Sequence, residues 1–235
     1  MKKIKSKKIK LLLIIFAPII LIIYFSNVDT TLTEDDIGVI SQLGLDDKCK
    51  NVDDLLSQVA CVSEIQQKVF SIVDVIHPGI RHNLTREPKD LIKEQKGLCF
   101  DRSRFIEKIL SYYDIKYRHV AIHYTQDNSS FPFLKKRANS HAFTEISTEK
   151  GWMVVDSVDT IIGFDSSHKV YSAKDLRENL SFIDVNNNSL SESFTTGKYS
   201  VIYGLYSRHG RFFPPFNGLP DINWVQLITY NIPFM

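Results

Sequence analysis

The stretch KGLCFDRSRFIEKILSYY, residues 96–113, decides the fold, because a glycine turn, a cysteine and an amphipathic helix follow one another directly. Cys99 is expected at the helix N-terminus, where unpaired N–H groups and the positive end of the helix dipole favour a thiolate. Gly97 permits an unusual backbone angle just before the helix. Apolar residues then recur at helical spacing, and their predicted buried face consists of Phe105, Ile106, Ile109, Leu110 and Tyr113.

Helices are predicted before this stretch and strands after it. Apolar spacing predicts helices over residues 33–44 and 52–76, with a stop at His77-Pro78-Gly79, and a further helix from Pro88 to about Lys96. Segments rich in β-branched and aromatic residues predict an antiparallel sheet from residues 117–124, 140–146, 152–155 and 199–206. Residues 127–136 and 186–193 are expected to be surface loops. The pattern therefore indicates an α+β fold.

Two of the predicted strands carry polar residues that could serve as the base and the orienting acid for the cysteine. His141 opens one strand and is followed by the small Ala142, so it can project toward the thiol. Asp156 ends the next strand, where it can accept a hydrogen bond from one ring nitrogen of His141 and hold the imidazolium. Asp159 is the alternative orienting acid. The three residues follow one another in the order Cys, His, Asp.

The segment from Glu94 to Thr160 resembles the transglutaminase-like superfamily of papain-like thiol enzymes. The residues that carry this resemblance are 96–99, 115–120, 139–145 and 151–156. The resemblance implies a transglutaminase-like α+β fold in which the nucleophile lies at a helix start on an antiparallel sheet. It also implies that Cys99 is the nucleophile, His141 the base and Asp156 the orienting carboxylate.

The expected function is that of a thiol enzyme that acts on amide or acyl bonds through an acyl-enzyme. Water as acceptor makes it a cysteine protease or amidase, and an amine makes it a transglutaminase; hydrolysis is slightly favoured, because nothing in the sequence suggests a site that excludes water. The expected partner is a protein, peptide or amine-bearing substrate, and no cofactor or metal is expected. The alternative is a catalytically silent binding module in the assembly of the cell envelope or of surface polysaccharide. A redox protein is disfavoured, because the spacing of Cys49 and Cys61 is far from C-x-x-C.

The N-terminus predicts a membrane segment. Six lysines stand in the first ten positions, and residues 11–25 form an apolar run of about 22 Å as a helix. This length suits either a signal-peptide core or an uncleaved anchor, and the absence of a clear cleavage pattern after Phe25 favours the anchor. Residues 1–28 are therefore expected to anchor a domain of residues 29–235, with the N-terminus cytoplasmic and the domain periplasmic or on the cell surface.

Composition supports a folded body. Of 235 residues, 43% are hydrophobic and 24% charged, which excludes a disordered chain. The net charge is +2, yet the 29 basic residues less the six leading lysines leave 23 against 27 acidic residues. No global basic surface therefore predicts nucleic-acid binding.

The remaining candidates carry weaker predictions. Cys49 and Cys61 either form a disulfide or stay unpaired, and sequence alone leaves both open. His119 and His123 share a strand face but lie too far apart for one metal, so each is expected to be satisfied or exposed. Residues 207–224, rich in rings and arginines, either cover a hydrophobic face or form a wall beside the site.

Overall fold

The computed structural model describes residues 14, 16–50, 52, 54–76, 79, 86–124, 139–160, 162–178, 194, 199–206 and 221–232. The predicted loops 127–136 and 186–193, and residues 207–220 of the predicted C-terminal wall, lie outside these residues.

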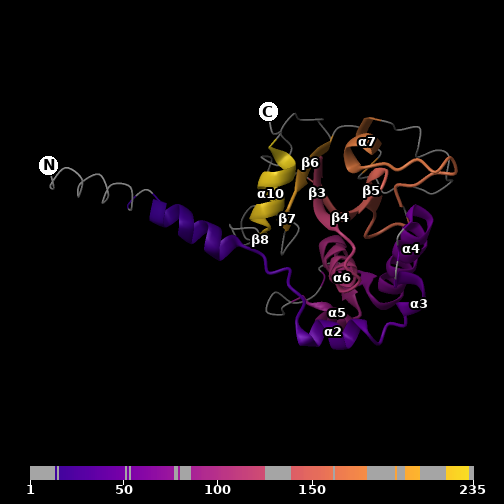
Figure 1. Cartoon of the computed structure of the whole chain (residues 1–235). Coiled ribbons are helices and arrows are strands. Elements are labelled where there is room, and N and C mark those ends of the chain that lie inside the picture. The colour runs from indigo at the N-terminus through magenta and orange to yellow at the C-terminus, as the bar shows by residue number, and fades with distance from the viewer. Residues whose placement is uncertain are drawn as a thin grey trace.

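The body is an α+β fold (Figure 1). Its helices are α2 (Glu34–Ile40), α3 (Asp46–Cys49), α4 (Leu55–Ile72), α5 (Pro88–Glu94), α6 (Cys99–Tyr112), α7 (Ala173–Glu178) and α10 (Trp224–Asn231). Its strands are β1 (Asp74–Val75), β2 (Lys96–Gly97), β3 (Tyr117–Tyr124), β4 (Asn139–Thr148), β5 (Gly151–Val155), β6 (Tyr199–Tyr203), β7 (Leu205–Tyr206) and β8 (Asp221–Ile222).

The main sheet has four antiparallel strands in the order β5-β4-β3-β6. Side chains alternate between its two faces, as the period of a strand requires. Met153 and Val155 join α4 and α6 in one core cluster, whereas Val154 between them joins α7 in the other. The sheet is therefore buried on both faces, with the helix that starts at Cys99 on one of them.

Three predicted boundaries were wrong. The predicted helix 33–44 ends at Ile40, and Gly44 has a positive φ of 72° shortly after it. The predicted helix 52–76 ends at Ile72, because Asp74 and Val75 pair in parallel with residues 96–97.

The third wrong boundary lies in the predicted strand 199–206, which is broken at Gly204 (φ 73°). A Cβ at Gly204 would lie 2.7 Å from both the Asn223 carbonyl oxygen and the Leu227 nitrogen, so α10 packs directly on this backbone. The chain turns there, and β7 pairs with β8 instead of extending the main sheet. Helices α7 and α10 were not predicted.

Cys49 and Cys61 form a disulfide, which joins α3 to α4. This result closes the alternative that the sequence left open. Cys99 is the free cysteine of the chain, since all three cysteines lie in the described residues.

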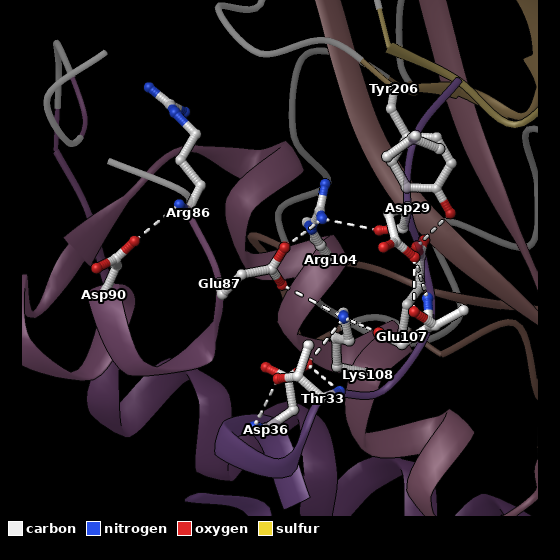
Figure 2. Close-up of polar contacts among 12 residues, drawn as sticks. Asp29, Thr33, Asp36, Arg86, Glu87, Asp90, Arg104, Glu107, Lys108 and Tyr206 are labelled. Atoms are coloured by element: carbon white, nitrogen blue, oxygen red, sulfur yellow. Dashed lines mark hydrogen bonds and ion pairs between the residues drawn. The ribbon is translucent and has the colours of Figure 1, made fainter. Parts of the chain in front are cut away.

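The segment of residues 27–33, which we call the strap, connects the N-terminal helix (residues 16–26) to α2 and lies across α6 (Figure 2). Arg104 donates to the Asp29 carbonyl oxygen at 3.0 Å and also pairs with Glu87. Lys108, which is buried, donates to the Thr31 carbonyl oxygen of the strap and, at 2.9 Å, to Asp36 of α2. These contacts fix the strap to the same helix that Cys99 begins.

In the N-terminal helix, every large apolar side chain between positions 16 and 25 is 40–75% exposed. Among the described residues, no helix combines the length and the apolar character that a membrane crossing requires. The predicted anchor, residues 11–25, lies partly outside them, at residues 11–13 and 15.

Candidate active site

Helix α6 begins at Cys99, and Asp101 in its first turn bonds both to the residue before the helix and to Arg86. The Asp101 carboxylate accepts from the Leu98 backbone N–H at 2.8 Å and so caps the helix start. Arg86 donates to the same carboxylate at 2.8 and 3.0 Å. Burial raises the pKa of Asp101, while Arg86 acts in the opposite direction. A Cβ at Gly97 would lie 2.9 Å from that of Asp101, so the close approach requires glycine.

The N-terminal end of α6 brings together Cys99, His141 and Asp156. His141 Nε2 lies 2.6 Å from Asp156 Oδ2. The register that pairs Thr144 with Val155 brings Asp156 alongside the beginning of β4, where His141 stands. Cys99, which is half-buried, lies close enough to the His141 side chain to raise the pKa of the imidazole. Since Nε2 faces the carboxylate, Nδ1 is the ring nitrogen left for the thiol.

The charges around His141 favour its protonated form. Burial disfavours the imidazolium, but the charge and hydrogen bond of Asp156 and the interactions with Cys99 raise the pKa of His141 well above 6.5. The ring is almost completely buried, so water screens these interactions little. The arrangement can hold a thiolate and an imidazolium side by side.

Asp156 is held by the loop that it begins. Its Oδ1 accepts from the backbone N–H groups of Val158 at 2.7 Å and Asp159 at 2.8 Å. Gln66 of α4 donates to the carbonyl oxygens of Asp156 at 2.9 Å and Asp159 at 3.1 Å. The carboxylate therefore has little freedom to turn away from His141.

Arg102 ties the same loop to the helices. It donates through Nε to the Val73 carbonyl oxygen at 2.6 Å and through Nη1 to that of Ser157 at 3.3 Å. Ser157 in turn donates to the Ala142 carbonyl oxygen at 2.5 Å, next to His141. Arg102 thus joins the end of α4, helix α6 and the loop that Asp156 begins.

Sequence reasoning missed Gln66 and Arg102, and no local signal could have revealed them. Both act on backbone carbonyls, and Gln66 stands 90 positions before Asp156. Only the packing of α4 and α6 against the end of the sheet brings them to this loop.

The walls of the site are apolar. Leu98, Phe100 and Ala142 form a small buried cluster against which Cys99 packs. On the other side, the rings of Phe143 and Phe194 lie 5.6 and 5.7 Å from that of His141. These side chains exclude water from the imidazole and strengthen its polar contacts.

The other sequence candidates lie apart from this group or serve it indirectly. Asp159 donates its backbone N–H to Asp156, and the carboxylate that lies against His141 is that of Asp156. His119 is buried and lies 2.7 Å from Glu107, under the stacked ring of Tyr206. His123 is also buried, so it is not an exposed histidine. Within the described part of the chain, no group of three or more His, Cys, Asp or Glu could hold a metal.

No protein-family model matches the chain, and no curated protein matches it. Among solved structures, the chain is similar to "a Putative Cysteine Protease from Cytophaga hutchinsonii", with 17% identity and a TM-score of 0.36. The match covers 56% of this chain and 45% of that one, so the chain spans less than half the length of that protein. At this TM-score the likeness assigns neither a family nor an activity.

Proposed function

We propose that this protein is a membrane-anchored thiol enzyme of the transglutaminase-like kind, which acts on amide or acyl bonds. The observation that carries the proposal is that one buried imidazole lies 2.6 Å from a fixed carboxylate and within electrostatic reach of the free cysteine at a helix N-terminus. A nucleophile beside a base that a third group orients is the general signature of covalent catalysis.

In the proposed reaction, the Cys99 thiolate attacks the carbonyl carbon of the substrate. As the tetrahedral intermediate collapses, the leaving amine takes the proton of the His141 imidazolium, and an acyl-enzyme remains. Water or a second amine then attacks the acyl carbon, gives its proton to His141 and releases the thiolate. Asp156 keeps the ring oriented and stabilises its charged form in both steps.

Two features support the anchor in this proposal. The N-terminal helix exposes apolar side chains on all sides, which is a costly arrangement in water. The lysines that precede it in the sequence suit the cytoplasmic side of a membrane. The strap then continues into the body, which the proposal places outside the cytoplasm.

The experiment is acylation of the full chain in detergent with a chromogenic ester such as p-nitrophenyl acetate, read by intact mass and peptide mapping. We expect one acyl group on Cys99, which water releases slowly and an added primary amine releases faster if transfer is the reaction. The His141→Ala variant should lose acylation. The matched control is His168→Asn, since His168 is an exposed histidine outside the site. If both variants were acylated equally, or if the natural chain were not acylated, the proposed enzyme activity would be refuted. The alternative of a catalytically silent binding module would then remain.

A further inference from the structure

Helix α10 has one face that packs on the body and one that does not. On its inner face, Gln226 accepts from the His119 backbone N–H at 2.8 Å. Asn231 accepts from the Tyr203 N–H at 3.0 Å and donates to the Tyr203 carbonyl oxygen at 2.9 Å. These contacts fix how the helix is rotated on the edge of the sheet.

The outer face of α10 is apolar and exposed. Val225 is 76% exposed and Ile228 51%, and Ile232, the residue that ends the helix, is 56% exposed. Their spacing of three and four places them on one side of the helix. Thr229 is exposed between them, and the whole helix, WVQLITYN, contains no charged residue. A helix that faces water normally carries charges on its outer side, so this face is suited to an apolar environment.

This face lies beside the end of the N-terminal helix. Ser26, which ends that helix, accepts a hydrogen bond from the Trp224 indole at 3.1 Å. Asn27 then forms a parallel bridge with Ile222, and Val28 donates to the Ile222 carbonyl oxygen at 3.0 Å. Figure 1 shows the N-terminal helix leaving the body beside β8 and α10. The end of the N-terminal helix is thus joined by direct contacts to β8 and to the first residue of α10.

We propose that the outer face of α10 lies in the surface of the lipid bilayer that holds the N-terminal helix. This inference rests on the anchor proposed above and adds a second membrane contact to it. A second copy of the chain is a poorer occupant, because an eight-residue helix is only about 12 Å long. So short a face contributes little of the roughly 800 Å² per partner that a stable interface buries. Interfacial helices instead bury one apolar face at the boundary of headgroups and acyl chains.

The consequence is a fixed position of the active site relative to the membrane. The strap binds α6 through Arg104 and Lys108, and α6 begins with Cys99. With the anchor and α10 both in the bilayer, the body has two membrane contacts and cannot swing freely. The nucleophile is then held at one height and in one orientation above the lipid.

The test is a depth measurement on the full chain in lipid vesicles. A nitroxide is attached at Thr229→Cys, and in a second sample at Glu64→Cys, both in a Cys99→Ser background in which the disulfide protects the other cysteines. Glu64 is exposed and belongs to α4, which lies on the other side of the body from α10 in Figure 1. We expect the ratio of oxygen to water-soluble nickel accessibility to be several-fold higher at position 229. Ile228→Glu should lower that ratio, whereas Ile37→Glu, at an exposed apolar position on α2, should not.

Flotation of the vesicles separates this inference from the anchor. If the chain floats with the vesicles but the label at position 229 is as accessible to nickel as that at position 64, the anchor stands and the α10 contact is overturned. Spin–spin broadening at position 229 would identify a second copy as the occupant and would also overturn it. A chain that does not float would refute both the anchor and the docking of α10.

Discussion

Replacing Asp156 with asparagine should uncouple His141 from Cys99 while leaving the loop in place. Asparagine retains a side-chain oxygen that can accept from the N–H groups of Val158 and Asp159, so the turn that Asp156 begins should persist. What is lost is the charge that faces His141 Nε2 at 2.6 Å. The Asp156→Asn variant therefore tests electrostatics rather than folding.

The expected magnitude follows from the bond that is weakened. A hydrogen bond to a charged group contributes about 1.5–3 kcal/mol, and each 1.4 kcal/mol is about tenfold in an equilibrium constant. The variant should hold the thiolate–imidazolium pair about 10- to 150-fold less often. Because Asp156 raises the pKa of His141, the difference from the natural chain should be largest at pH values just below that raised pKa. At lower pH, where the imidazole of the variant also protonates, the difference should shrink.

The assay is the rate of alkylation of the full chain by iodoacetamide as a function of pH. With Cys49 and Cys61 in a disulfide, the modification reports Cys99 alone. The natural chain should react readily near neutral pH, and Asp156→Asn should approach an ordinary thiol, which reacts fully only above a pKa of about 8.5. Asp159→Asn is the matched control. An unchanged pH profile in Asp156→Asn, or a larger effect of Asp159→Asn, would refute the assignment of Asp156.

Three further outcomes are expected. Gly97→Ala should destabilise the protein by about 1–3 kcal/mol in urea unfolding and slow alkylation, because its Cβ would lie 2.9 Å from that of the capping aspartate. Gly38→Ala, in open space within a helix, should instead stabilise the protein by about 1 kcal/mol; equal effects would contradict the close packing of Gly97 against Asp101. Burial lowers the pKa of His123 to about 4, so its contribution to stability is present above pH 6.5 and lost as the pH falls toward 4. That loss amounts to about 3 kcal/mol, and His123→Gln should unfold with a visibly smaller dependence on pH over this range. Replacing Cys49 and Cys61 together with alanine should cost about 3 kcal/mol by the loop-entropy estimate, measured by urea unfolding; an unchanged midpoint would show that the bond does not constrain the unfolded chain.

Local patterns predicted the elements that carry the site. The apolar spacing after Gly97 predicted α6 with Cys99 at its start, and alternation predicted β4 with His141 near its beginning. These predictions succeeded because a helix face and a strand face are periodic along the chain itself. The same reasoning could not find the end of α4, since β1 forms through pairing with β2 twenty-two positions further on.

What the sequence determined by itself was the α+β class, the positions of the long helices and central strands, and the candidate residues Cys99, His141 and Asp156. Only the tertiary structure decided that Cys49 bonds to Cys61, that His141 faces Asp156, and that Gln66 and Arg102 hold the loop of the acid. It also decided that α10 lies beside the end of the N-terminal helix. The physical reason is that these contacts join residues far apart in the chain, and their distances depend on how helices and sheet pack rather than on any local preference.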